Sequence, residues 1–150
     1  MELRLADEHE IPALTALSKA AFDTDSQVGS PEPGGPPEYD SVPWHQSMRA
    51  QGHLYSLLKD GVLVGGMLLF RDGQDVLYVG RVFIAPCFQR QGYGLEAMRA
   101  AERLFPGVRV IRLDTPVWNR RTNRFYPRLG YAEVRRDAES VYYEKRLEPA

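Results

Sequence analysis

The chain has 150 residues, and 19 basic and 20 acidic side chains leave a formal net charge of −1 at pH 7. A nearly neutral chain has no global field that would favour nucleic acid or a membrane as a partner. One cysteine excludes an internal disulfide framework and a cysteine-based zinc site, and no metal site is expected. Because this length is typical of one domain, we expect a single domain over residues 1–150.

The N-terminal residues lack the long apolar core of a signal peptide. The longest apolar stretch, residues 62–70, is too short to span a bilayer. A cytoplasmic location is therefore expected.

The hydrophobic pattern predicts four strands, two helices and one long loop before residue 85. They are a strand at 2–6, a helix after the Asp7 cap, a Pro- and Gly-rich loop at 24–37, a short helix at 43–50, and strands at 54–59, 62–70 and 76–84. Asp60 and Gly61 between two of these strands are a strong hairpin signal.

The second half of the chain predicts two more helices and three strands. A helix begins near Leu95, with an apolar face made by Leu95, Met98, Ala101 and Leu104. A strand at 108–113, a helix at 119–129 stopped by Gly130, and a closing hairpin at 131–135 and 141–147 follow. This order predicts an α/β fold with a mixed, mostly antiparallel sheet and helices on both faces.

The most informative segment joins the strand at 76–84 to the next helix. It reads Gln89-Arg90-Gln91-Gly92-Tyr93-Gly94. Glycines allow successive backbone N–H groups to point into one concavity, and the first N–H groups of the helix lack internal partners. A pyrophosphate fits such a site.

One alternative for this segment is a dinucleotide fingerprint. Gly92-x-Gly94-x-x-Ala97 satisfies it, and Asp114 lies where a ribose-binding carboxylate is expected. Against it, several residues separate the strand from the first glycine, and too little chain follows Asp114 to complete a doubly wound sheet.

The run from Val82 to Gly94, together with the order of elements, resembles the GNAT superfamily of N-acetyltransferases. A second match is Asn-Arg-Arg-Thr-Asn-Arg-Phe-Tyr-Pro-Arg-Leu-Gly-Tyr at 119–131, which is similar to the Asn…Tyr…Gly-Phe/Tyr segment of that family. The resemblance covers nearly the whole chain and implies the GNAT fold.

The resemblance implies acetyl-CoA as the acetyl donor and assigns residues to it. Val82, Phe83 and Ile84 would offer backbone groups to the pantetheine arm and the thioester carbonyl, and Asn119 would bind the arm. The backbone of the phosphate loop would bind the pyrophosphate, and its residues are Gln89, Arg90, Gln91, Gly92, Tyr93, Gly94 and Leu95.

Tyr126 would stand near the sulfur as general acid in a GNAT enzyme. Asn119 and Tyr126 are seven residues apart, about two helical turns, so both face the same way. A phenol of pKa about 10 can protonate a thiolate of pKa about 8.5 at modest cost. A buried aromatic with a satisfied hydroxyl is the alternative for Tyr126.

Asp114 is the candidate base. Many GNAT relatives carry a glutamate on the strand before the loop, but Gly80 occupies the corresponding position here. Asp114 lies five residues before Asn119, where some peptide N-terminal acetyltransferases of the family carry their base. It would act through water or with a pKa raised by burial, and capping a turn before Pro116 is the alternative.

The acceptor is expected to be a cationic primary amine, on a small molecule or a peptide. Residues 20–48 contain five carboxylates and no lysine or arginine, and in the family this part of the chain covers the acceptor site. The carboxylates are Asp23, Asp25, Glu32, Glu38 and Asp40. The sequence leaves open a homodimer, and a non-catalytic acyl-CoA-binding module is the alternative to an enzyme.

Overall fold

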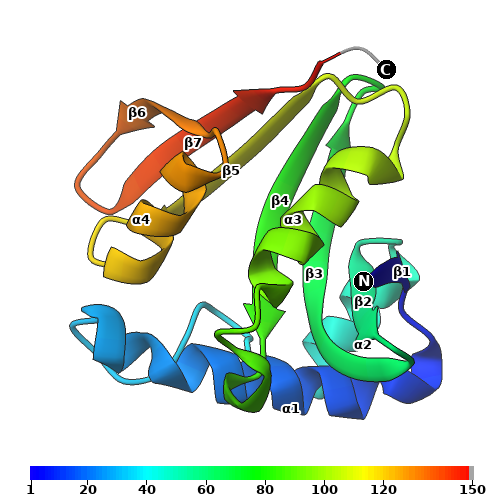
Figure 1. Ribbon diagram of the computed structural model, residues 1–150. Helices are drawn as coiled ribbons and strands as arrows, with labels where there is room; N and C mark the ends of the chain where they lie inside the picture. The colour runs from blue at the N-terminus through cyan, green and yellow to red at the C-terminus, as the bar shows by residue number, and fades with distance from the viewer. Residues whose placement is uncertain (149–150) are drawn as a thin grey trace.

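The structure is a computed structural model that describes residues 1–148 (Figure 1). The strands are β1 (Glu2–Leu5), β2 (Leu54–Lys59), β3 (Val62–Asp72), β4 (Val76–Ile84), β5 (Val110–Pro116), β6 (Ala132–Arg136) and β7 (Ser140–Arg146). The α-helices are α1 (Ile11–Phe22), α2 (Val42–Ala50), α3 (Tyr93–Leu104) and α4 (Arg120–Arg128). Three 3-10 segments complete the list: η1 (Glu8–Glu10), η2 (Asp23–Val28) and η3 (Pro86–Phe88).

The strands form one seven-stranded sheet in the order β1-β2-β3-β4-β5-β7-β6. Within the described residues, β4 and β5 are the only parallel neighbours, and α3 makes the crossover between them. The expected mixed, mostly antiparallel sheet is therefore confirmed. It is not the doubly wound parallel sheet that the dinucleotide interpretation requires.

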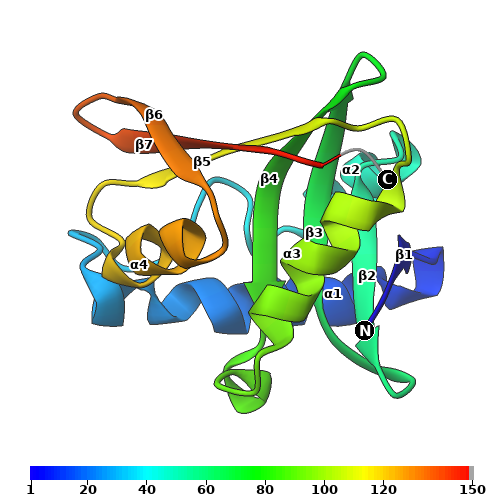
Figure 2. The same ribbon diagram turned by 45° about the horizontal axis from the view of Figure 1, so that its top comes forward.

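The helices cover both faces of the sheet (Figures 1 and 2). α1 and α2 enclose a smaller apolar core that includes Leu14, Leu54 and Phe83. α3 and α4 enclose a larger core on the other face, which includes Met98 and Ile111. Each helix therefore stabilises the fold by burying one apolar face against the strands.

Local signals explain where several elements begin. Asp60 and Gly61 both have positive φ, 52° and 79°, as a tight hairpin turn with the right-handed twist of its strands requires. Asp7 and Glu10 form a capping box at η1, and Ser41 accepts a hydrogen bond from the Trp44 backbone at the start of α2.

Glu10 joins three elements through its buried carboxylate. Arg4 of β1 donates to it at 2.9 and 3.0 Å, and the Ser56 hydroxyl of β2 donates at 2.9 Å. Burial opposes ionisation, but these hydrogen bonds and one from the Asp7 backbone outweigh it and lower the pKa of Glu10 to about 2. The ionised carboxylate therefore fastens η1 to the first two strands.

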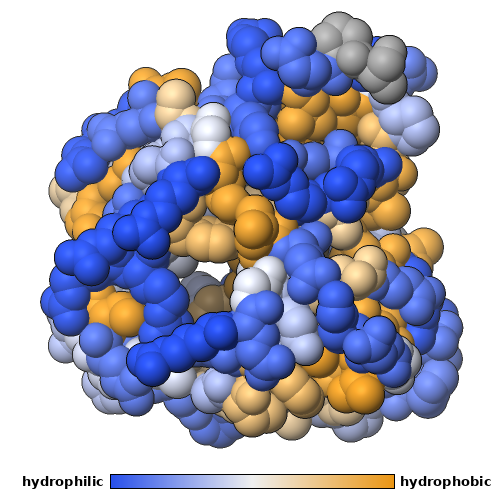
Figure 3. All heavy atoms as spheres, in the orientation of Figure 1, coloured by the Kyte–Doolittle hydropathy of each residue, from blue (hydrophilic) through white to orange (hydrophobic). Residues whose placement is uncertain are grey.

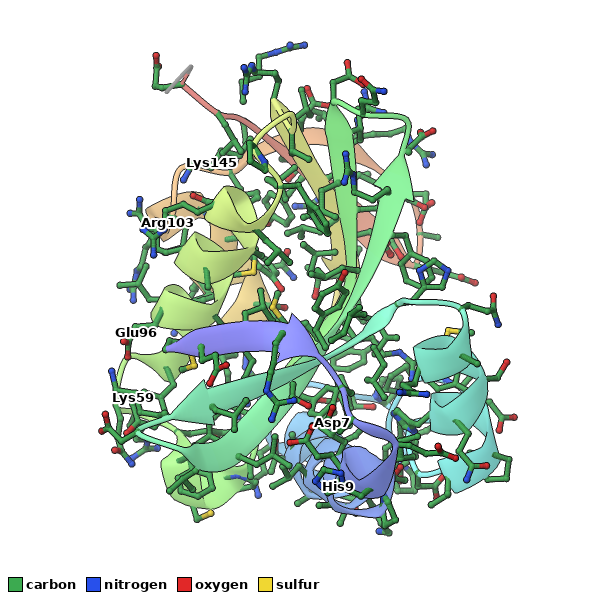
Figure 4. All side chains as sticks on the ribbon, turned by 90° about the vertical axis from the view of Figure 1, so that its right-hand side faces the viewer. Asp7, His9, Lys59, Glu96, Arg103 and Lys145 are labelled. Carbon is green, nitrogen blue, oxygen red and sulfur yellow. The ribbon has the colours of Figure 1, made fainter. Side chains whose placement is uncertain are left out.

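Ion pairs connect α3 to the strands beside it. Lys59 at the end of β2 and Glu96 on α3 point toward each other in Figure 4, with 2.7 Å between Nζ and Oε1. Near the other end of the helix, Lys145 of β7 lies 3.0 Å from Glu102. The Lys59–Glu96 pair is partly exposed and contributes at most about 1 kcal/mol, whereas the Lys145–Glu102 pair is largely buried, with 17% and 9% of the two side chains exposed.

The strands β4 and β5 separate after a short contact. Their pairing spans Val76 to Val79 on β4, and no later residue of β4 pairs with β5 (Figure 1). On the other side of β4, Leu68 pairs with Arg81 and Leu69 with Val79, so Gly80 is the extra residue of a β-bulge. A bulge bends the strand that contains it, and this bend in β4 occurs where β4 diverges from β5.

Some predicted boundaries differ from the structure. The strand expected at 108–113 is observed as β5, Val110–Pro116, because its pairing with β7 continues to Pro116. Leu95 is 40% exposed and does not share the buried face of α3, which is Ala97, Met98 and Ala101. The expected loop at 24–37 begins as the 3-10 segment η2.

No helix within residues 1–148 combines the length and apolar character needed to cross a membrane.

Candidate active site

A cavity of about 410 Å³ lies where β4 and β5 separate. Its lining includes Val82 of β4, Asp114 of β5, Asn119 and Tyr126 at α4, and Asp25 of η2. Figure 3 shows the molecule hollowed in this region, between α4 and the end of α1. The volume falls within the usual range for sites that bind small molecules.

Tyr126 is 5% exposed and lies on the cavity. Its ring packs against Phe125, Tyr131 and Tyr143, with centroids 5.2 to 5.9 Å away, which fixes the position of the side chain. Burial and then the negative charge of Asp114 raise the pKa of its hydroxyl above that of an ordinary phenol. Tyr126 is therefore protonated throughout the neutral range.

Asp114 is half-buried on the same cavity. The Tyr78 hydroxyl of β4 donates a hydrogen bond to the Asp114 carboxylate, across the place where the two strands are still neighbours. Burial raises the pKa of Asp114, while a hydrogen bond from the Ser140 side chain opposes the shift. A carboxylate with a raised pKa is a stronger base than an ordinary aspartate.

Asn119 is the N-cap residue of α4 and is 9% exposed. Its Oδ1 accepts a hydrogen bond of 3.1 Å from the Thr122 backbone. Among residues 1–148 its Nδ2 group has no hydrogen-bond partner, so it can donate to a molecule in the cavity. Asn119 thus both starts the helix that carries Tyr126 and presents a polar group beside it.

η2 and the residues after it close the cavity on the side of α1. Gly29 has a φ of 118°, and a Cβ atom added to it would lie 2.3 Å from the carbonyl oxygen of Trp118. Only glycine allows this approach. Arg120 at the start of α4 also donates to the Gln27 carbonyl at 3.2 Å, so η2 is held against the β5–α4 connection.

The edge of β4 that faces the cavity has backbone groups without a strand partner. Val82, Phe83 and Ile84 pair with β3 on one side only, since β5 has already diverged. An extended polar chain can add to such an edge through main-chain hydrogen bonds. The Gln89 side chain donates to the Ile84 carbonyl at 2.9 Å, and this bond braces the loop that follows the strand.

The predicted phosphate loop follows β4 and leads into α3. Arg90 and Gly92 have left-handed φ angles, 64° and 79°, and Gly92 is the N-cap of α3. No side chain among residues 1–148 caps this helix, so the N–H groups of its first turn have no side-chain acceptor there. Gln91 and Leu95 are exposed, and Tyr93 and Gly94 are half-buried. This backbone conformation suits an anion.

The histidines near these motifs, His45 and His53, do not line the cavity, whereas Arg81 of β4 does. His45 is fully buried beside Trp44, and its Nδ1 bonds to the Ser41 carbonyl at 2.7 Å. His53 packs on Phe70. They are therefore part of the structure around β2, β3 and α2 rather than of this cavity.

The sequence does not single out two side chains that contribute to this region, Asp25 and Tyr78. Asp25 was counted only as part of the acidic segment, yet it is 9% exposed and lies on the cavity. Tyr78 was counted only as a residue of a strand, yet it donates to Asp114. Neither side chain belongs to a motif, because each acts through contacts with residues far away in the sequence.

Comparisons with known proteins identify the family of the chain. The model of the acetyltransferase (GNAT) family matches residues 15–131. The chain is 30% identical over 133 residues to YrkN, an uncharacterised Bacillus subtilis protein, with 83% of this chain and 68% of YrkN covered.

Two solved structures have a similar fold. A PaiA N-acetyltransferase from Thermoplasma acidophilum in complex with coenzyme A has a TM-score of 0.81 at 16% identity, with 97% of this chain and 98% of that chain covered. The ribosomal-protein-S18-alanine N-acetyltransferase of Escherichia coli has a TM-score of 0.73 at 15% identity, with 99% and 95% covered. Acetyl-CoA is the donor that the matched family uses. The chain belongs to the GNAT family of acetyltransferases.

Proposed function

We propose that this chain is an acetyl-CoA-dependent N-acetyltransferase that acetylates a primary amine by direct attack. The observation that carries the proposal is the cavity at the divergence of β4 and β5, on which Asp114, Asn119 and Tyr126 converge. The N-acetyltransferases of similar fold support nitrogen as the acceptor atom.

The residues present fit the donor. The one-sided edge of β4 at Val82, Phe83 and Ile84 would bind the amide groups of the pantetheine arm, and Asn119 Nδ2 would donate to the same arm. The uncapped start of α3, with Gly92 and its neighbours, would bind the pyrophosphate. When bound, acetyl-CoA supplies an activated thioester.

Tyr126 would hold a proton beside the leaving sulfur. Moving a proton from an ordinary phenol to a thiolate of pKa about 8.5 costs about 2 kcal/mol, and burial makes Tyr126 a weaker acid than that. Tyr126 would therefore first stabilise the negative charge that develops on the leaving sulfur by donating a hydrogen bond to it. The proton would move from the hydroxyl to the sulfur as that charge grows.

Asp114 would accept a proton from the ammonium group of the acceptor, directly or through a water molecule, and the neutral amine would then attack the thioester. At pH 7, deprotonation costs about 1.4 kcal/mol for an α-amine and about 4.6 kcal/mol for a lysine-like amine. Because the pKa of Asp114 is raised, it lies closer to the pKa of the amine. Proton transfer to Asp114 is therefore less unfavourable for either class of amine. Because the GNAT glutamate position is Gly80, Asp114 is the carboxylate best placed for this step.

The acceptor is proposed to be cationic. Besides Asp114, the carboxylate residues Asp25 and Glu32 line the cavity, and both come from the acidic segment at 20–48. Acidic side chains around a site raise the local concentration of cations and orient them.

A thermal-shift series combined with a thiol-release assay tests the proposed function. Acetyl-CoA should raise the unfolding midpoint by mass action, whereas NAD should not. Release of free coenzyme A should then depend on an added amine. Stabilisation by acetyl-CoA without release, across aliphatic amines, amino acids and peptides, would instead indicate a module that binds the cofactor without turnover.

A further inference from the structure

Asp25 is a buried carboxylate without a partner. It is 9% exposed, and among residues 1–148 no side chain or backbone group donates a hydrogen bond to its carboxylate. Buried carboxylates are normally paired or hydrogen-bonded, because removing the charge from water is costly. The other strongly buried carboxylate, Glu10, has Arg4, Ser56 and the Asp7 backbone as donors.

The position of Asp25 directs this charge toward the cavity. The buried side of α1 carries Leu14, Ser18 and Ala21, and Asp25 continues this side into η2. Near η2 the strands β4 and β5 have separated. Asp25 therefore lines the cavity instead of packing against the sheet. The close contact of Gly29 with the Trp118 carbonyl fixes the segment that follows it.

Within residues 1–148 no cationic side chain forms an ion pair with Asp25, although Arg81 also lines the cavity. Arg121 is exposed and acts on it only through its charge, while Asp23 has a repulsive effect. Burial raises the pKa of Asp25 to about 6, so the side chain is still mostly ionised above pH 7. An ionised group in this position destabilises the protein until a cation enters the cavity.

We infer that Asp25 binds a second, unreacting ammonium group of the acceptor, and that the acceptor is therefore a dibasic amine. The inference rests on the proposed function, in which the reacting amine lies at Asp114. Asp25 comes from η2 and Asp114 from β5, so two different elements each present a carboxylate to the cavity. A molecule with two amines satisfies both, whereas a monoamine leaves Asp25 unpaired.

Three acceptors of matched length test whether the enzyme requires a second ammonium group on its acceptor. They are 1,4-diaminobutane, 1-aminobutane and 4-aminobutanoate, which carry a positive, a neutral and a negative distal group. The wild-type protein should prefer the diamine over the monoamine by about tenfold or more in kcat/KM, because the pair with Asp25 is desolvated. The acid should be the poorest acceptor.

Asp25→Asn should reduce this preference to near one, mainly through KM for the diamine. Asp40→Asn is the matched control, because Asp40 carries the same charge in the same acidic segment but is exposed and lies outside the cavity lining. The control should retain the wild-type preference. Thermal unfolding should show that Asp25→Asn folds, with a midpoint above that of the wild type at pH 7.5.

Two results would overturn the inference. An unchanged preference in Asp25→Asn would exclude an ammonium at this position, and an equal fall in kcat for both amines would make Asp25 part of the chemistry instead. Absence of turnover with every amine would count against the proposed function. The inference about Asp25 would then be tested by the binding of 1,4-diaminobutane alone. In that case 1,4-diaminobutane should still raise the unfolding midpoint of the wild type and of Asp40→Asn, but not of Asp25→Asn.

Discussion

At the scale of single residues, the hydroxyl of Tyr126 can be removed while the aromatic packing is kept. Tyr126→Phe should lower kcat about 100-fold, the low end of what a positioned proton donor contributes. The affinity for acetyl-CoA should change by about fivefold at most, because one neutral hydrogen bond is involved. Steady-state kinetics and isothermal titration calorimetry measure the two effects.

Tyr143→Phe is the control for the loss of a hydroxyl from this aromatic cluster. Tyr143 contacts the ring of Tyr126, but its hydroxyl donates to Asn123 at 2.8 Å and does not line the cavity. It should cost stability without lowering kcat. Equal losses of kcat in the two variants would mean that packing, and not a proton, accounts for the role of Tyr126.

Asp114 should leave a signature in the dependence of kcat/KM on pH. Because the pKa of Asp114 is raised, its protonation should cause a loss of activity at a pH above the ordinary aspartate value of 3.8. Asp114→Asn should remove this acidic limb, and the loss of rate should be larger for amines of higher pKa. Rates measured from pH 4 to 9 with a lysine-like amine and a weakly basic amine test both points.

Tyr78→Phe separates this titration from a general loss of structure. The Tyr78 hydroxyl donates to Asp114 and so favours its ionised form. Without it, the acidic limb should move to higher pH but persist. An acidic limb that is the same in wild type and in Asp114→Asn would assign the titration to another group.

The sequence could predict those residues of the cavity that also carry a local signal. Asn119 is recognisable as a helix start, and Tyr126 lies two turns along the same helix, so the structure places both on the cavity. Asp25 has no such signal. Its burial depends on the separation of two strands more than 50 residues away in the sequence, which no local pattern encodes.

At the scale of secondary structure, the start of α3 is the element on which donor binding depends. The left-handed Gly92 can be replaced by Glu or by Gln, and both substitutions strain the backbone equally, by about 1–2 kcal/mol. A Cβ atom at this position meets nothing within 4 Å, so steric overlap within the protein does not distinguish the variants.

The charge alone should then separate the two variants. Gly92→Glu should weaken coenzyme A binding about tenfold more than Gly92→Gln does, because a carboxylate would face the pyrophosphate. The ratio should shrink when salt is raised, since exposed charges are screened. Titration calorimetry at two ionic strengths measures it, and equal affinities of the two variants would place the phosphates elsewhere.

Element type was easier to predict than element ends. The prediction of a hairpin around Asp60 and Gly61 is confirmed, because the turn residues and the flanking strand patterns indicate the same local structure. β5 extends to Pro116 because β7 pairs with it there, and that partner is invisible to a local apolar pattern. Leu95 fits the helical spacing but is exposed, since the packing of α3 on the sheet favours Ala97 and Met98 instead.

At the scale of the whole molecule, the site is a consequence of the sheet. The bulge at Gly80, the short β4–β5 contact and the closure by η2 together make the cavity. Figures 1 and 2 show β4 and β5 diverging. The family resemblance predicted the fold and assigned residues to the donor, whereas periodicity predicted only the helices and strands. The separation of two neighbouring strands depends on pairing across the sheet, which is not encoded in either strand alone.

Buried titratable groups give the stability of the whole molecule a pH dependence of mixed sign. Glu10, with its pKa lowered to about 2, stabilises the fold above pH 4.5, and this contribution is lost as the pH falls from 4.5 to 2. Asp25, with its pKa raised to about 6, has the opposite effect, so stability increases as the pH falls from 6 to 3.8. Burial lowers the pKa of His45, which opposes Asp25 below pH 6.5.

Variants isolate these contributions, since the difference from wild type cancels the other groups. The free energy of unfolding of Asp25→Asn should exceed that of the wild type by about 1–3 kcal/mol at pH 7, and the difference should vanish by pH 4. Glu10→Gln should instead be less stable by about 3 kcal/mol above pH 4.5, with the difference shrinking toward pH 2. Urea unfolding across pH 2–8 measures both curves, and a pH-independent difference for either variant would show that its carboxylate does not titrate as the structure requires.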